Sequence, residues 1–221
     1  MIVRRRLSAV LAGALLLAAL VGCSKVPGIY VYEKAGSTQQ GGAVAFDPKT
    51  YVDGIWTSKI VPTVQQKAVE VTTVAAAIDK DPDAAGKQYG VRSGTGSPYA
   101  YMVKGTGTVT KIDTDAPTGP MTVQVPAAAG GKPVTLTIAT GPVIAGTAIR
   151  DAVGFISFGD FTNQIDYAKV ANAINDRVKT EVIAKTEVKS LTGKKVTFAG
   201  AFSSLTPGTI FLVPTELRAA A

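Results

Sequence analysis

The sequence contains no histidine and a single cysteine, Cys23. Without histidine it has no Ser-His-Asp or Cys-His catalytic group and no His-ligated metal, and one cysteine forms neither an internal disulfide nor a cysteine zinc site. It also lacks a Walker loop, a nucleophile elbow and a Ser-x-x-Lys motif. Only carboxylates, Lys, Ser, Thr and Tyr remain for catalysis. The sequence therefore predicts a protein without enzymatic activity, cofactor or metal.

Aromatic and charged residues are also few, at 7% and 18% of 221 residues, whereas hydrophobic residues reach 46%. These proportions are typical of folded proteins with an aliphatic core. The formal net charge is +7, but three arginines lie in the leader, and without them it falls to +4. Lys194 and Lys195 are the only adjacent bases after the leader, so no basic stripe indicates a nucleic-acid partner.

The first 22 residues have the three parts of a secretory signal. Met1–Arg6 is basic, and Leu7–Leu20 is an apolar run too short for a stable transmembrane helix. Leu20-Val21-Gly22-Cys23 resembles the bacterial lipobox, in which the cysteine becomes the lipidated first residue. The alternative is an ordinary signal or anchor with a chance cysteine. Acyl chains contribute about 0.8 kcal/mol per buried methylene, so lipidation of Cys23 predicts durable attachment to a membrane outside the cytoplasm.

After the signal over 1–22, the chain divides into three predicted regions. Residues 23–46 are rich in Gly and polar side chains and predict a tether, in which Ile29–Tyr32 is interpreted as an edge strand rather than a membrane-interface segment. Residues 47–98 predict a helical N-terminal segment that packs on a barrel domain over 99–221.

Two Asp-Pro pairs mark helix starts in the helical segment, with Asp47 and Asp81 as the N-caps. Apolar residues at spacings of three and four predict one helix from Pro62 to Asp79. Asp79, Asp81 and Asp83 resemble the start of a calcium loop, but its required Gly and Glu are absent, so no calcium site is predicted.

From Tyr101 the apolar period changes to two, which is typical of strands. Glycines at 105 and 107 would let the first strand bend. Four more alternating runs follow, at Met121–Val125, Val134–Ile138, Val196–Phe202 and Ile210–Val213. A helix over about Ile165–Ala184 lies between the third and fourth strands. We therefore predict an α+β fold: a five-stranded OB-like β-barrel with a long helix between strands 3 and 4, preceded by a small helical segment. Another small barrel or an α+β sandwich is the alternative.

The candidate ligand-binding residues are Arg150, Asp151, Asn163, Gln164 and Trp56. Arg150 offers a planar fork of donors to an anion or a pair of sugar hydroxyls. Four of these candidates also have a structural interpretation. Arg150 and Asp151 could form a local ion pair or N-cap in a short helix through Ile156, Asn163 could cap the long helix, and Trp56 could anchor the core instead of stacking on a ligand.

Three phenylalanines follow at spacings of three, at positions 155, 158 and 161. They could line a stacking surface, but this spacing fits one helical face, and we interpret them as core residues.

Several segments together resemble a known family: Gly141–Asp151, Phe158–Gln164 and Leu191–Phe202, with Tyr51-Val52 and Ile55-Trp56 upstream. They are similar to an uncharacterised family of predicted bacterial periplasmic lipoproteins, domain-of-unknown-function family 2291. Genes of this family often lie beside sugar ABC importers. The resemblance implies a lipid-anchored protein of the cell envelope, with transporter components or a carbohydrate as partner. No activity is established for the family, so no functional residues are transferred.

Three functions follow in order of preference. The first is a non-catalytic binding or accessory lipoprotein, which the family resemblance links to sugar ABC import. The second is a structural envelope protein that acts through protein–protein contacts. The third is a carboxylate-based glycoside hydrolase, for which Asp151 and Asp160 are acids that the sequence offers without indicating their separation.

Overall fold

The computed structural model describes residues 46–128, 130–205 and 208–220. Outside these residues lie the predicted signal peptide, the predicted lipidation site at Cys23, the segment Ile29–Tyr32 and nearly all of the predicted tether. Residues 45–221 form one compact unit. The helices that precede the barrel strands therefore belong to the same folded body as the strands.

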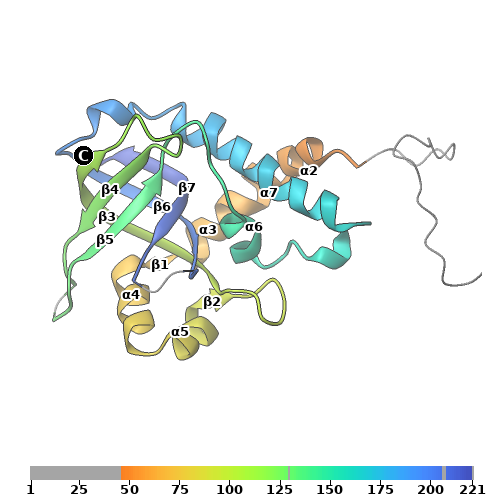
Figure 1. Cartoon of the computed structure of the whole chain (residues 1–221), viewed down its shortest axis with the longest axis horizontal. Helices are drawn as coiled ribbons and strands as arrows, with labels where there is room; N and C mark the ends of the chain where they lie inside the picture. The colour runs from red at the N-terminus through yellow and green to blue at the C-terminus, as the bar shows by residue number, and fades with distance from the viewer. Residues whose placement is uncertain (1–45, 129, 206–207, 221) are drawn as a thin grey trace, which may run out of the picture. The chain divides into compact units, whose positions relative to one another are not determined.

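Five strands form a closed barrel (Figure 1). They are β3 (Ala100–Ile112), β4 (Pro120–Val125), β5 (Val134–Ala139), β6 (Lys195–Ser203) and β7 (Phe211–Ala219). They pair in the order β3-β4-β5-β7-β6, and β6 pairs again with β3 and closes the ring. β5 and β7 are parallel and the other pairs are antiparallel. The predicted OB-like barrel is confirmed. The fifth strand is longer than predicted because β7 pairs with β6 as far as Ala219.

β3 shows the predicted alternation, with Val103 and Val109 buried and Lys104 and Thr106 exposed. Its first part pairs with β6 and its last part with β4, so the strand passes from one neighbour to the other. A Cβ atom at Gly107 would lie 2.6 Å from a methyl group of Val123 and 2.7 Å from a β4 carbonyl oxygen. Glycine is therefore required where β4 approaches β3.

The single helix predicted from Pro62 to Asp79 is wrong. The structure has α3 (Val61–Lys67) and α4 (Val71–Lys80), separated by the two-residue strand β1 (Val69–Glu70). Val69 and Glu70 pair in parallel with Val103 and Lys104 of β3. The apolar spacing continues across the break because Val64, Ala68 and Val71 all contact the same core. Pairing with β3, which the local pattern does not reveal, interrupts the helix.

Both predicted N-caps are confirmed. The Asp47 carboxylate accepts hydrogen bonds from the backbone N–H groups of Lys49 and Thr50 at the start of α2 (Pro48–Ile55). Asp81 accepts equivalent bonds at the start of α5 (Pro82–Tyr89). α2 continues through a π-helical turn, η2 (Trp56–Ile60), into α3. After α5, the short strand β2 (Gly90–Val91) pairs with β3.

The long helix is confirmed as α7 (Gln164–Val178), which ends in the π-helical turn η4 (Lys179–Ile183). Its apolar residues form one buried stripe, made of Tyr167, Val170, Ala171, Ile174, Val178 and Val182. α7 packs on α2, β7 and the short helix α6 (Ala148–Val153), while α6 packs on β3 and β6. A short 3-10 turn, η5 (Val188–Ser190), leads from η4 towards β6.

The prediction that Phe155, Phe158 and Phe161 share one buried helical face is wrong. α6 ends at Val153 because Gly154 adopts a left-handed backbone conformation with φ 76°. Phe155 lies in the following loop, and Phe158 begins the 3-10 turn η3 (Phe158–Asp160). Phe155 and Phe158 are exposed and Phe161 is half-buried. The left-handed glycine thus ends the helix, and the rings of Phe155 and Phe158 that follow it lie towards solvent.

Candidate functional site

The five predicted ligand-binding residues occupy three different environments. Trp56 lies on η2 with 3% of its surface exposed and belongs to the core. Arg150 and Asp151 lie together on α6. Asn163 and Gln164 are exposed at the start of α7, where Asn163 accepts a hydrogen bond from the Asp166 N–H as the N-cap. Among the described contacts, none joins these three groups into one site.

Arg150 forms a buried cluster with Asp151 and Tyr167. Arg150 is 7% exposed. Its Nη2 lies 2.8 Å from Asp151 Oδ1, and its Nη1 donates to the Tyr167 carbonyl oxygen at 3.2 Å. The guanidinium carbon lies 3.7 Å from the centre of the Tyr167 ring. Thr147 Oγ1 donates to the other oxygen of Asp151. Because these groups satisfy one another, the cluster acts as a link between α6 and α7.

The pKa of the Tyr167 phenol is raised above its ordinary value. Its removal from water raises the pKa of the phenol, while the nearby Arg150 charge opposes this and Asp151 reinforces it. The phenol hydroxyl donates towards Asp151 Oδ1 at 3.4 Å. The hydroxyl therefore stays protonated and keeps its donor role across the neutral range.

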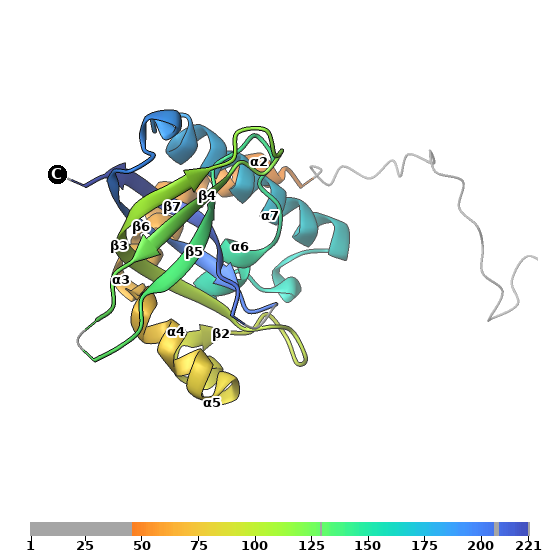
Figure 2. The ribbon, with the colours of Figure 1, turned by 60° about the vertical axis from the view of Figure 1, so that its left-hand side comes forward.

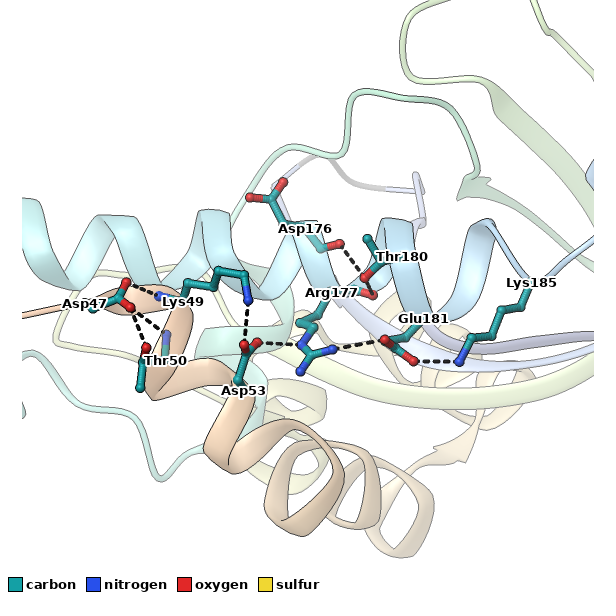
Figure 3. Close-up of polar contacts among 9 residues, drawn as sticks. All are labelled: Asp47, Lys49, Thr50, Asp53, Asp176, Arg177, Thr180, Glu181 and Lys185. Atoms are coloured by element: carbon teal, nitrogen blue, oxygen red, sulfur yellow. Dashed lines mark hydrogen bonds and ion pairs between the residues drawn. The ribbon is translucent and has the colours of Figure 1, made fainter.

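A second polar cluster joins α2 to α7 and η4 (Figure 3). Asp53 Oδ1 lies 2.7 Å from Arg177 Nε, and both atoms are shielded from water with no hydrogen bond to another described residue. Lys49 contacts the other Asp53 oxygen at 2.6 Å. Glu181 is paired with Arg177 at 3.0 Å and with Lys185 at 2.7 Å.

Both carboxylates in this second cluster have lowered pKa values. The hydrogen bond from Lys49 is the largest cause of the low pKa of Asp53, and that from Lys185 is the largest for Glu181. Each acid is therefore ionised at neutral pH and unsuited to act as a proton donor. The cluster neutralises charge between two helices, and its role is to stabilise their packing.

A cleft between α4 and the barrel is the best candidate for ligand binding. A hollow of about 150 Å³ is lined by α4, the start of β5, the end of β6 and the segment before β7. A second hollow of about 440 Å³ adjoins it between α4 and Gly130–Val134, and Asp79 lines both. In OB-folds, strands 2–3 and the loops that follow strands 1 and 4 bind ligands. β5 is the third barrel strand and the β6–β7 connection follows the fourth, so the cleft shares that location.

The cleft combines an apolar floor with polar groups at its rim. Phe202, buried and stacked on Tyr101 with ring centres 5.1 Å apart, forms part of the floor. Asp79, Thr135 and Ser204 supply a carboxylate and two hydroxyls. Across the described residues, no ion pair or hydrogen bond involves the Asp79 carboxylate. The arrangement can accept and donate hydrogen bonds to a hydroxyl-bearing ligand.

Asp79 is also unfavourable for its own helix. It lies in the last turn of α4, where the helix dipole is negative and stabilises cations rather than carboxylates. Stability of α4 therefore does not account for an acid at this position. Natural proteins break such local rules at functional or strained sites.

This cleft was not predicted from the sequence, in which Asp79 was considered only as a calcium ligand and rejected in that role. The usable signal was the OB-fold prediction itself, since it directs attention to the third strand and to the connection after the fourth. Over the residues that the structure describes, no acidic or cysteine cluster is arranged to hold a metal. Nor does any described helix have the length and hydropathy needed to cross a bilayer.

Comparison with solved structures shows which fold class the protein belongs to. A crystal structure of an OB-fold protein from Thermotoga maritima superposes with a TM-score of 0.64 and 23% sequence identity, over 80% of this chain and 100% of that chain. This similarity shows the fold alone. No curated protein matches the chain.

The family model for predicted periplasmic lipoproteins (DUF2291) matches residues 14–218. The chain belongs to this family, as the sequence resemblance had indicated. Family membership places the protein in the cell envelope as a lipid-anchored protein.

Proposed function

We propose that the protein is a non-catalytic binding lipoprotein that takes a carbohydrate, or a similar hydroxyl-rich ligand, in the cleft beside α4. The carrying observation is the exposed Asp79 carboxylate, which lines both hollows without a partner among the described residues. A carboxylate that accepts hydrogen bonds from two neighbouring hydroxyls matches the chemistry of a sugar ring. Lipidation at Cys23 would hold the module at the membrane.

An accessory role in sugar ABC import is the finer form of this proposal. It is supported by the family resemblance in the sequence and by the polar character of the cleft. The first hollow is smaller than the 300–1,000 Å³ of most ligand pockets, whereas the adjoining one, at about 440 Å³, lies within that range. A mono- or disaccharide would therefore occupy mainly the larger hollow.

The experiment is a melting series of the mature protein with mono- and oligosaccharides, followed through the fluorescence of buried Trp56. A ligand that binds only the native state raises the melting temperature. We expect Asp79→Asn to abolish the ligand-induced shift while it keeps or slightly raises the unliganded melting temperature. The matched control is Asp115→Asn, which changes another exposed acid outside the cleft lining.

Two results would reject the proposal. One is the absence of a shift with every sugar tested. The other is a shift that Asp79→Asn leaves intact. Hydrolysis of an oligosaccharide during the assay would instead favour the hydrolase, although Asp151 and Asp160 both have internal partners, Asp160 accepting from the Ser157 N–H. Most glycoside hydrolases use two carboxyl groups that flank the glycosidic bond to be cleaved.

The second candidate, a structural envelope protein that acts through protein–protein contacts, is favoured by one observation. Phe155 and Phe158 are large exposed aromatics on the same connection between α6 and α7. Such surfaces on a monomer mark contact with a protein or a membrane. In-cell crosslinking from position 158 to another envelope protein would support this candidate.

A further inference from the structure

We propose that the protein docks onto the lipid bilayer through its aromatic face, defined as Phe155, Phe158 and Ile165. The three residues come from the α6–α7 connection and the first turn of α7. Phe158 is 51% exposed and Ile165 is 66% exposed. Amphipathic surfaces that bind membranes place aromatic and branched apolar side chains at the boundary between headgroups and acyl chains.

The aromatic face is held by a rigid cluster of rings. Phe161 lies 5.4 Å from Phe46 and 5.6 Å from Tyr51, measured between ring centres. The ring of Phe158 meets that of Tyr167 edge-on at 5.8 Å, and Tyr167 is fixed from its other side by Arg150. The exposed Phe158 ring is therefore packed on an ordered cluster, so docking through it would not require this part of the face to fold first.

The occupant is identified by where the chain leads. Phe46 is the first described residue and contacts Phe161, whose ring packs on Tyr167 as Phe158 does. It lies 23 positions after Cys23, and a chain of that length spans at most about 80 Å even when fully extended. A lipid on Cys23 would therefore keep the bilayer within reach of this end of the protein. Tethering turns docking into an intramolecular event, so a weak contact suffices.

A hollow beside the face suits a lipid headgroup. It measures about 520 Å³ and is lined by Tyr51, Phe155 and the exposed side chains of Lys59 and Gln66, among others. Within the described part of the chain, Lys59 forms no ion pair. A lysine at the edge of an apolar surface is placed to meet a lipid phosphate. The nearby acid Asp160 is occupied as part of the capping box of η3.

Docking through this face would orient the rest of the molecule. Figures 1 and 2 show α4 at a different end of the folded unit from the start of α2 and the α6–α7 connection. The cleft beside α4 would then point away from the membrane. This proposal depends on the membrane anchor but not on the ligand of the cleft, so either can fail without the other.

The test places one indole at each end of the full lipidated protein. Phe158→Trp reports on the aromatic face. Leu205→Trp is the matched control, because Leu205 is 75% exposed next to Ser204 of the cleft. The native Trp56, 3% exposed, supplies a constant background. Each protein is floated with phosphatidylcholine vesicles, and emission is compared between plain lipid and lipid brominated on the upper acyl chain.

We expect brominated lipid to remove most of the emission added at position 158 and none of that added at position 205. Ile165→Trp should repeat the result for position 158. Equal emission of the Phe158→Trp variant in both lipids would overturn the proposal, and so would equal quenching at both positions. Blue-shifted but unquenched emission that depends on protein concentration would overturn it in favour of a second copy covering the face. Failure of the wild-type protein to float would remove the anchor and the proposal together.

Discussion

The two ends of the folded unit each combine a charged side chain with an aromatic one, but the charged residue is exposed at one end and buried at the other. At the cleft end, Phe202 is buried, and the exposed carboxylate of Asp79 has no ion pair or hydrogen bond to another described residue. At the other end, Arg150 is buried and an aromatic ring, Phe158, faces solvent. The difference shows that residue type alone does not identify a site. What matters is whether the surroundings satisfy the group.

The largest expected difference between the two ends comes from truncating one phenylalanine at each. Phe202→Ala removes a fully buried ring that stacks on Tyr101, and we expect a loss of about 4 kcal/mol in unfolding free energy. Phe158→Ala should cost about 1 kcal/mol or less, because the half-exposed ring loses little more than its edge-on contact with Tyr167. Urea unfolding of both variants measures the difference. Equal losses would show that Phe158 is a core residue after all.

The next largest effect concerns the buried guanidinium. Arg150→Ala leaves the Asp151 carboxylate buried without its cation, and we expect a loss of about 3 kcal/mol. Arg218→Ala is the control. Its side chain is 70% exposed and paired with Glu216, so the loss should be about 0.5 kcal/mol or less. A ligand role without a structural one would instead leave the melting temperature of Arg150→Ala unchanged.

A smaller difference in stability is expected between Asn163 and Gln164, two neighbours at the start of α7 that were predicted to bind a ligand. Asn163→Ala removes the N-cap and should cost about 1 kcal/mol. Gln164→Ala, one position later, should change stability by only a few tenths of a kcal/mol, since alanine favours helix. Thermal unfolding monitored by circular dichroism measures both. Similar losses would argue against the capping role of Asn163.

The smallest effect is the response of the α2–α7 cluster to acid. The pKa of Glu181 in the folded protein lies below its ordinary value of 4.5. The charged form is therefore favoured by folding, and its contribution is present above pH 4.5 and lost as pH falls through the lowered pKa. Melting temperatures between pH 7 and pH 3 should fall less steeply for Glu181→Gln than for the wild type. Parallel curves of melting temperature against pH would show that Glu181 does not contribute to the loss of stability in acid.

The OB-like barrel was predictable because its signals are local. Each signal depends on residues close together in the sequence. They are the alternation in β3 and β4, the apolar stripe of α7 and the Asp-Pro caps of α2 and α5. The structure agrees with all of them. The lipoprotein family was likewise recognisable from the leader and from motifs such as Gly141–Asp151.

The errors share a non-local cause. The helix predicted from Pro62 to Asp79 is interrupted because Val69 and Glu70 pair with a strand more than thirty residues away. The three phenylalanines at spacings of three appeared to form a helical face, but the left-handed Gly154 ends α6 first. Spacing describes a face only where the backbone remains helical, and a neighbouring strand or glycine can end the helix.

Periodicity and capping chemistry were enough to establish which elements form and in what order, because these preferences act between residues close in the chain. The closure of β6 on β3 and the burial of Arg150 were settled by packing between distant segments. Packing also exposed Phe158 and brought Asp79 of α4 beside Ser204 of β6–β7. Burial and partnership are properties of the surroundings of a side chain, and those surroundings exist only after distant elements have come together.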